Sequence, residues 1–244
     1  MDRAVFDRMD SQEEVHWWFS ARRTIIRTTI ERLIDLPEEA RILEAGCGTG
    51  GNLEMLSAFG ALRAFELDAP ARERAVEKSG IAVVEGALPD NVPFDGVAFD
   101  LIGLFDVLEH VEQDEPALAA LAGRLAPEGR ILLTVPAFPW LWSAHDDRHH
   151  HFRRYTRASL ADVAGRAGLS VDHSFYFNTA LFPVAVAARA VKRITNSDAP
   201  DDTLPSPFVN GTLRSVFTAE RHLIGRVAMP VGLSLCAILK ARSA

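Results

Sequence analysis

Cysteine is scarce in this chain: only Cys47 and Cys236 occur among 244 residues. Two cysteines cannot supply the disulfide framework that small secreted domains use. The opening segment, MDRAVFDRMDSQEE, also lacks the apolar stretch that forms the core of a signal peptide. Together these absences predict a protein of the reducing cytoplasm.

Long hydrophobic runs and an excess of positive charge are missing as well. The longest charge-free apolar runs, 179–188 and 227–239, are shorter than the roughly 18 residues of a transmembrane helix. We therefore expect no membrane span, although a peripheral membrane contact stays open. Lysine and arginine number 26 against 33 aspartates and glutamates, which gives a net charge of −7. A chain without a basic field is not expected to bind nucleic acid.

Glycine, by contrast, is concentrated in the segment 41–51, which reads RILEAGCGTGG. A short apolar run leads to Glu44, four glycines follow, and a helix-like segment begins near Asn52. This pattern predicts a strand, a tight turn and a helix. Glycines let a ligand approach the backbone, and free N–H groups at the start of a helix attract negative charge. The segment therefore predicts a site for a nucleotide-like ligand.

The glycine spacing fits two cofactor fingerprints. The pattern GxGxxG at 46–51 is the dinucleotide motif of NAD-dependent oxidoreductases, and ExGxGxG at 44–50 is the motif of class I methyltransferases that use S-adenosyl-L-methionine (SAM). The glycines alone leave both open, along with a turn that binds nothing. Glu66 lies twenty residues after Gly46, at the end of the next predicted strand. In a doubly wound sheet an acid there accepts hydrogen bonds from the ribose of an adenosine.

Apolar strands and amphipathic helices alternate along the rest of the chain. Alternation with short connections predicts an α/β fold with a doubly wound, Rossmann-like sheet of seven strands that is mostly parallel. The last of these strands would be an antiparallel exception to the parallel order. The expected strands after the glycine turn are 61–66, 81–85, 98–104, 130–135, 169–175 and 233–241.

Four segments resemble the class I SAM-dependent methyltransferases. They are ILEAGCGTG at the turn, FEL at the second strand, FDLIGLFDVLEHV at the fourth strand and LAPEGRILLTVP at the fifth strand. Their order and spacing over residues 40–136 are similar to the group that includes the ubiquinone-biosynthesis O-methyltransferases. The resemblance implies SAM as the cofactor and methyl transfer as the reaction, and it favours the methyltransferase motif over the dinucleotide motif.

The resemblance also assigns parts of the cofactor site to single positions. It implies that the glycine turn and its preceding acid hold the methionine and ribose parts of SAM. The acid that ends the second strand would take the ribose hydroxyls, and the residue after it would pack on the adenine. The residues at these positions are Glu44, Gly46, Cys47, Gly48, Glu66 and Leu67.

Two other places complete the implied cofactor site. Phe105 and Asp106, after the fourth strand, would line the methionine end of SAM. Many relatives have an acid after the third strand that holds the adenine amino group, but Ala87 stands at that position here. We expect backbone groups around Leu88, or the side chain of Asp90, to make the adenine contact instead.

The N-terminal segment HWWFxARR and the segment VPAFPWLWSAHDDRHHHFRRYTRASL resemble a bacterial subset of these enzymes. In that subset the N-terminal helix caps the cofactor. This implies that Arg22 or Arg23 contacts the SAM carboxylate through a charge-assisted guanidinium pair. A helix that only packs on the core is the alternative.

Tryptophan, histidine, aspartate and arginine are concentrated in 137–155. We interpret this segment as a lid, in which aromatic rings exclude water and His145 or His151 accepts the acceptor's proton. A solvated lid held by structural ion pairs is the alternative. No pair of histidines with an acid has secure metal-ligand spacing, so no metal site is expected. His110 is interpreted as a residue of its loop or of the cofactor pocket.

The sequence thus predicts a cap helix in 1–36, a SAM-binding core in 37–176, a helical insertion in 177–228 and a final core strand in 229–244. The expected activity is methyl transfer from SAM to an oxygen or nitrogen of a small or lipid-linked acceptor. The apolar insertion favours the lipid-linked kind, although a homodimer contact would also use it. An NAD-dependent oxidoreductase and a non-catalytic SAM-binding module are the alternative functions.

Overall fold

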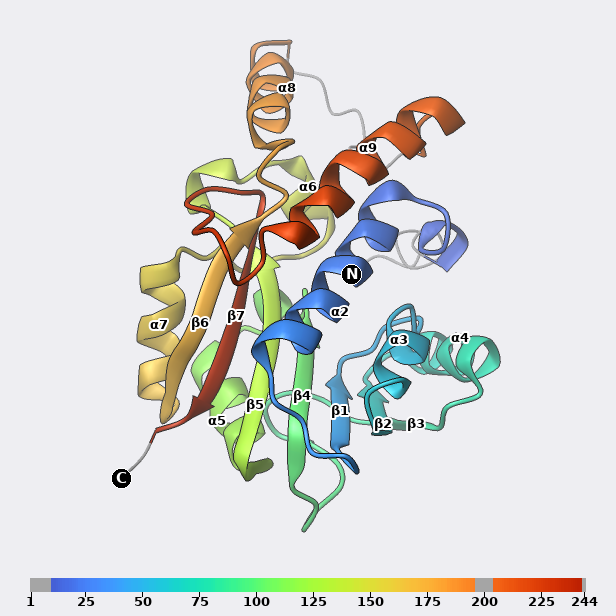
Figure 1. The fold of residues 1–244 in the computed structure, drawn as a ribbon, viewed down its shortest axis with the longest axis vertical. Coiled ribbons are helices and arrows are strands. Elements are labelled where there is room, and N and C mark those ends of the chain that lie inside the picture. Colours follow the sequence, from blue (N-terminus) through green and yellow to red (C-terminus); the bar gives the residue numbers. More distant parts are fainter. Residues whose placement is uncertain (1–9, 196–203, 243–244) are drawn as a thin grey trace.

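A seven-stranded sheet forms the centre of the molecule (Figure 1). The computed structural model describes residues 10–195 and 204–242. The strands lie in the order β3-β2-β1-β4-β5-β7-β6, which confirms the predicted doubly wound sheet. They are β1 (Arg41–Ala45), β2 (Ala61–Glu66), β3 (Val83–Glu85), β4 (Phe99–Phe105), β5 (Leu125–Pro136), β6 (Leu169–Phe177) and β7 (Ser234–Ala241).

The sheet is parallel from β3 to β5 and antiparallel at β7. Parallel strands covered by helices on both faces need apolar side chains on both faces, and β4 is buried almost throughout. The seventh strand predicted at 233–241 is found at Ser234–Ala241. It hydrogen-bonds to β5 on one side and to β6 on the other, so the antiparallel prediction is confirmed.

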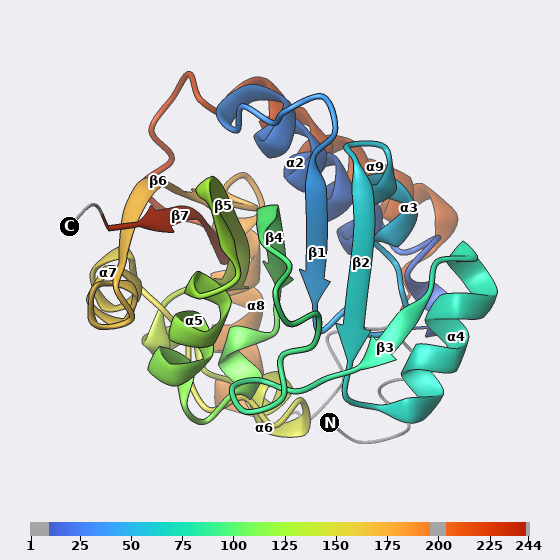
Figure 2. The same ribbon diagram turned by 90° about the horizontal axis from the view of Figure 1, so that it is seen from below.

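Helices cover both faces of the sheet (Figure 2). One face carries α2 (Trp17–Leu33), α3 (Leu53–Ser57), α4 (Ala69–Ser79) and α9 (Pro207–Ala219). The other face carries α5 (Asp114–Ala122) and α7 (Arg157–Arg166). The helices α6 (Ala144–Arg148) and α8 (Phe182–Thr195) lie beyond the ends of the central strands (Figure 1).

Two clusters of buried side chains hold these helices on the sheet. On one face, the isoleucines of α2 join strand residues such as Ile42 and Leu101. On the other face, Leu118 of α5 and Leu160 of α7 join Leu133 of β5. Each fully buried aliphatic side chain contributes about 1.5 to 3 kcal/mol relative to an exposed one. The helical spacing of apolar residues seen in the sequence is thus explained by burial against the sheet.

Helix α9 fixes part of the insertion against the core. The Asn210 side chain donates to the Val15 carbonyl and accepts from the Trp17 N–H, each at 2.9 Å, at the start of α2. Phe217 is fully buried and stacks on Phe177 of β6, with 6.0 Å between ring centroids. This half of the insertion therefore packs on α2 and on the sheet.

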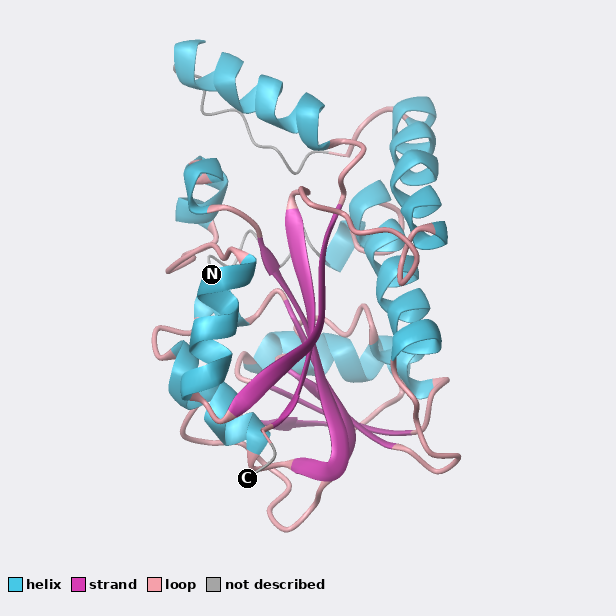
Figure 3. Ribbon diagram, turned by 60° about the vertical axis from the view of Figure 1, so that its left-hand side comes forward, coloured by secondary structure: helices cyan, strands magenta, loops and turns pink. Residues whose placement is uncertain are grey.

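Helix α8 is much less covered. Val184 is 66% exposed and Val191 is 57% exposed, and in Figure 3 the helix at the top stands clear of the strands. Its first residue, Phe182, meets the rings of Phe138 and Trp140 edge-on. Across residues 10–195 and 204–242, no helix is both long and apolar enough to cross a bilayer. The insertion residues 196–203 lie outside the described part of the chain.

We expect Phe217→Ala to lower the free energy of unfolding by about 3 to 4 kcal/mol, because it removes a buried ring and leaves a cavity. Phe208→Ala is the matched control, since that ring lies on the same helix and is 84% exposed. It should change stability by less than about 0.5 kcal/mol. Urea denaturation followed by circular dichroism measures both. Equal effects would show that α9 does not dock through Phe217.

Candidate active site

The glycine turn joins β1 to α3 and uses backbone angles that favour glycine. Gly46, Gly48 and Gly50 have φ angles of +71°, +54° and +87°. The N–H groups of Gly46 and Cys47 both donate to the Phe65 carbonyl, at 2.9 and 3.1 Å. The turn is therefore fastened to the end of β2. Burial raises the pKa of the Cys47 thiol, so this cysteine stays protonated.

Glu66 holds the turn from the neighbouring strand. Its Oε2 atom accepts from the Gly48 N–H and its Oε1 atom accepts from the Asp68 N–H, both at 2.9 Å. A carboxylate oxygen has two lone pairs, so each oxygen keeps capacity for one more donor. Leu67, the next residue, is 66% exposed beside it. The sequence placed Glu66 and Leu67 at one edge of the turn, and the structure brings them there.

Glu44 lies beneath the turn and is almost completely buried. Its Oε1 atom accepts from Asn52 Nδ2 at 2.8 Å, while Oε2 has no hydrogen-bond partner among the described residues. Burial is the main cause that raises the pKa of Glu44 to about 8, although the Asn52 hydrogen bond opposes it. Glu44 is therefore largely protonated at neutral pH. The Arg22 charge also acts on it, to favour ionisation.

The loop after β3 is held by hydrogen bonds between its own residues. Ala87 and Asn91 exchange two backbone hydrogen bonds of 2.9 Å, so the Ala87 N–H is already used. Leu88 is partly buried against the core, and a cis peptide bond links it to Pro89. Of the groups proposed for the adenine contact, the Ala87 backbone donor is thus committed to the loop itself.

An ion pair joins the N-terminal helix to the end of β4. The Arg22 guanidinium contacts the Asp106 carboxylate and lies 4.8 Å from the centre of the Trp18 ring. Arg22 is buried, and its Nε atom has no partner in the described parts of the chain. Burial lowers the pKa of Arg22 to about 10, so it stays charged at neutral pH. Phe105, just before Asp106, is buried under α2.

Glu13 is a site residue that the sequence analysis missed. It is buried above the glycine turn, where it accepts from the Thr49 hydroxyl at 2.9 Å and pairs with Lys78 of α4. A side chain at Gly51 would meet the Glu13 carboxylate at 2.7 Å. The segment before α2 thus covers the turn. No local signal marked Glu13, because its partners lie 36 and 65 residues away.

The predicted lid at 137–155 is organised around Asp146, which is fully buried. Arg154 donates to both carboxylate oxygens of Asp146, at 2.7 and 2.9 Å. His151 Nδ1 lies 2.9 Å from Oδ1, and the Ser143 N–H donates to Oδ2 at 2.8 Å. The hydrogen bonds from His151 and Arg154 outweigh the effect of burial and hold the pKa of Asp146 well below its usual value. Asp146 is therefore ionised and can only accept.

His145 and His110 are neutral in this environment. Burial is the largest cause that lowers the pKa of each to about 3, and neighbouring histidines add to it. The Nδ1 atom of His145 is buried and finds no partner within the described residues. Glu109, beside His110, is also buried, which raises its pKa to about 8. The structure thus brings His145, His151 and the loop after β4 together.

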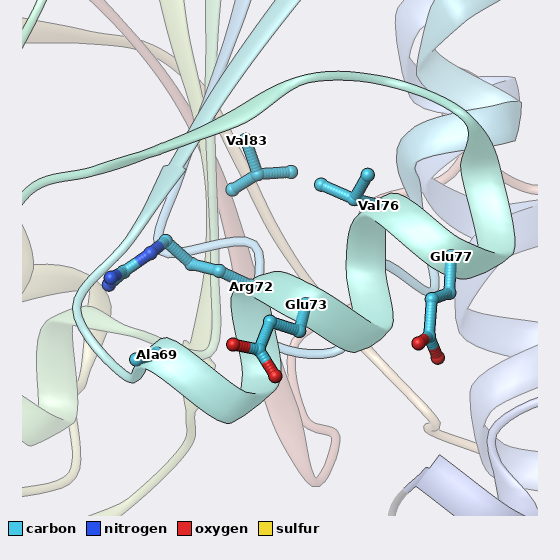
Figure 4. A pocket seen from close by; sticks show the side chains of 6 residues that line it. All are labelled: Ala69, Arg72, Glu73, Val76, Glu77 and Val83. Atoms are coloured by element: carbon cyan, nitrogen blue, oxygen red, sulfur yellow. The ribbon is translucent and has the colours of Figure 1, made fainter.

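A shallow depression elsewhere lies between α4 and β3 (Figure 4). Val76 and Val83 point toward one another there, whereas Glu73 and Glu77 extend from the helix. Its lining residues are Ala69, Arg72, Glu73, Val76, Glu77 and Val83. None of these residues is a predicted cofactor residue, although Arg72 donates to the carbonyls of Glu66 and Leu67 at the end of β2.

Residues 18–174 match the model of a methyltransferase domain family, and the match covers more than half of the chain. The chain belongs to this family. Residues 18–174 are thus a methyltransferase domain whose cofactor is SAM, which decides between the two fingerprints at the glycine turn. The closer resemblance to the ubiquinone-biosynthesis group stays a prediction.

Solved structures share the fold of this methyltransferase domain. A TehB-like SAM-dependent methyltransferase from Corynebacterium glutamicum has a TM-score of 0.54 at 21% identity, with 91% of this chain and 87% of that chain covered. The CcbJ methyltransferase from Streptomyces caelestis has a TM-score of 0.60 at 13% identity, covering 92% and 90%. The N-methyltransferase NodS from Bradyrhizobium japonicum, in complex with S-adenosyl-L-homocysteine, has a TM-score of 0.51 at 19% identity, covering 64% and 78%.

One curated relative has higher identity over a shorter stretch. The uncharacterized protein syc1184_c from Synechococcus is 36% identical over 108 residues, which make up 40% of this chain. The match spans only 25% of that relative's own length. The activity of the longer protein therefore does not transfer to this one.

We expect Glu44→Gln to flatten the pH dependence of stability. The pKa of Glu44 is about 8 in the folded domain and about 4.3 in an unfolded chain. The folded state holds the extra proton between these values, so wild-type stability falls as pH rises from about 5 to about 8. Glutamine mimics the protonated acid, so the variant should lose less stability over this range, by up to about 4 kcal/mol.

Urea denaturation at about pH 5 and about pH 8 measures this difference. The exposed residue Glu38 supplies the control variant Glu38→Gln, which should keep the wild-type slope. Parallel slopes for wild type and Glu44→Gln would contradict a protonated Glu44.

Proposed function

We propose that this protein transfers a methyl group from SAM to an oxygen or nitrogen of a small or lipid-linked acceptor, and that it does so in the cytoplasm. The observation that carries the proposal is the position of Glu66, fixed by two backbone N–H groups at the edge of the glycine turn. Each of its oxygens keeps a lone pair for a ribose hydroxyl, and Leu67 supplies an apolar surface for the adenine. The resulting site recognises an adenosine.

The strand order supports the same placement. β1 lies between β2 and β4. The strands β2 and β3 therefore lie on one side of β1 and the strands from β4 onward lie on the other, which makes this position the switch point of the sheet. Ligands of doubly wound sheets bind at such a switch point, beyond the carboxyl ends of the strands. In this placement the adenosine lies across the ends of β1 and β2. Its sulfur end faces Phe105 and Asp106 at the end of β4.

Arg22 is suited to the carboxylate of the methionine part. Its guanidinium is charged, lies beside Asp106 and has a buried Nε–H with no partner in the part of the chain described. An unsatisfied buried donor is costly, and a ligand carboxylate would satisfy it. Arg23 is less suited, because its guanidinium donates to the Glu13 carbonyl at 2.8 Å.

Methyl transfer itself needs an acceptor lone pair in line with the bond from sulfur to the methyl carbon. Holding the two reactants at near-attack distance supplies up to about 7 to 11 kcal/mol in well-oriented systems. A base is required only when the acceptor loses a proton. The prediction that His145 or His151 serves as that base rests on their position in the lid, beside the loop after β4.

The exposed apolar residues of α8 and α9 favour a lipid-linked acceptor. They include Val184 and Val191 on α8 and Phe208 on α9, which is 84% exposed. Each of these side chains adds apolar surface to an insertion helix, and large exposed apolar patches mark interaction sites. A homodimer or a peripheral membrane contact would cover the same residues.

We expect Glu66→Ala to weaken SAM binding by about 2 to 4 kcal/mol, because it removes charge-assisted hydrogen bonds to the ribose. Isothermal titration calorimetry with S-adenosyl-L-homocysteine measures the change. The control is Glu77→Ala, which removes an exposed acid of α4 and should bind like wild type. An unchanged affinity in Glu66→Ala would remove Glu66 from the cofactor site.

Transfer from tritium-labelled SAM to two pools of acceptors separates the acceptor classes. One pool holds small polar hydroxyl and amine compounds, and the other holds detergent-dispersed lipids with hydroxyl or amine headgroups. We expect label in an O-methyl or N-methyl product, with more label in the lipid pool. Binding of S-adenosyl-L-homocysteine without transfer to either pool would instead indicate a non-catalytic SAM-binding module.

A further inference from the structure

Four histidines meet where the lid reaches the loop after β4. The rings of His110 and His151 lie 4.6 Å apart, and those of His145 and His149 lie 4.0 Å apart. His149 and His151 are 5.8 Å apart, so the two pairs form one cluster. Glu109 is the acid beside them. The cofactor placement described above uses none of these five residues.

The geometry points to a metal site, and we propose that Glu109, His110 and His151 bind a divalent first-row transition-metal ion. One possible ligand atom from each of these residues lies within 4.8 Å of the others. Glu109 is only 1% exposed, and its Oε2 atom has no hydrogen-bond partner among residues 10–195 and 204–242. A buried acid oxygen without a donor is costly to retain, and a cation bound there would satisfy it.

Asp146 orients one of the ligands. Arg154 donates to both oxygens of the Asp146 carboxylate, so this carboxylate acts as an acceptor and His151 Nδ1, at 2.9 Å, donates to it. The lone pair of His151 is then on Nε2, where a metal ion can take it. Metal-binding histidines commonly donate their other ring N–H to a carboxylate in this way. Arg154 holds Asp146 through both oxygens, so the carboxylate that orients His151 is itself held in place.

The lid backbone sets the spacing of the three ligands. The Phe152 N–H donates to the Glu109 carbonyl at 2.7 Å, which places His151 beside Glu109 although 42 residues separate them. Ligand atoms about 2.1 Å from an ion lie about 3 to 3.5 Å from one another. Side-chain movements of about 1 to 2 Å would therefore bring the three ligand atoms to this spacing.

The ligand types define the class of metal. Two imidazoles and one carboxylate suit Zn²⁺ or Fe²⁺ and leave further positions open to water or another ligand. A metal ion would take the lone pair that a proton acceptor uses, so this assignment replaces the role of base that the sequence suggested for His151. It does not depend on the proposed methyl transfer.

The test is metal binding by the full chain, purified without a histidine tag and stripped with a chelator. Equilibrium dialysis against Zn²⁺ and the visible spectrum of added Co²⁺ report stoichiometry and coordination. We expect about one ion per chain, and an affinity at least tenfold weaker in Glu109→Gln and His151→Ala. The controls Glu112→Gln and His173→Gln alter exposed residues of the same types and should bind like wild type.

Circular dichroism and titration with S-adenosyl-L-homocysteine on the same samples separate this proposal from the proposed function. If the cofactor product binds and no stoichiometric Zn²⁺ uptake occurs, the metal site is wrong while the methyltransferase proposal stands. If folded Glu109→Gln and His151→Ala bind Zn²⁺ as tightly as wild type, the assigned ligands are wrong. If Zn²⁺ binds and the cofactor product does not, only the proposed function is overturned.

Discussion

The buried ion pair between Arg22 and Asp106 joins α2, which covers one face of the sheet, to the end of β4 in the candidate active site. A buried guanidinium is stable only when its charge is matched, and Asp106 stands at the end of β4 to match it. The pair fixes α2 over the carboxyl end of the sheet. Asn210 then fixes α9 to the start of α2. The beginning of α2 is thus bonded to the sheet through Arg22 and to α9 through Trp17.

The charge of Arg22 also acts on two buried acids, Glu44 and Glu109. Glu44 and Glu109 are both buried, and burial raises the pKa of each to about 8. Arg22 acts on both acids in the opposite direction. Around neutral pH Arg22 is therefore charged, and these two acids are largely protonated. A positively charged group close to a buried acid favours its ionised form.

The sequence specified most of the sheet because burial on both faces demands continuous apolar strands. The strand predicted at 61–66 is found at Ala61–Glu66. The fifth strand was predicted to start at 130 and starts at Leu125 instead. Pro127 and Gly129 indicated a break, but the chain passes through them as an irregularity, since Leu125 pairs with Phe99 and Arg130 pairs with Leu101. A local turn signal cannot reveal such pairing.

The site was predictable only where its residues follow strands. Glu66 and Asp106 could be placed because each ends a strand of the predicted sheet. Glu13 and Asp146 could not, because each acts through partners that only the folded chain brings near. In the sequence, Asp146 is one acid among several in a polar segment. In the structure, Arg154 and His151 both bond to its carboxylate. Residues of this kind can be identified only from the tertiary structure, whereas the glycine turn is recognisable from its local sequence.

The predicted lid, 137–155, and helix α8 are in direct contact. Arg189 of α8 donates to the Leu141 carbonyl of the lid at 3.0 Å, and Phe182 meets Phe138 and Trp140. The other end of the lid is fastened by Tyr155, whose N–H donates to the Pro136 carbonyl at 2.9 Å. The segment is thus attached to β5 through Tyr155 and to α8 through Leu141. The predicted lid and α8 are therefore joined by contacts that the sequence does not reveal, because 48 residues separate Arg189 from Leu141.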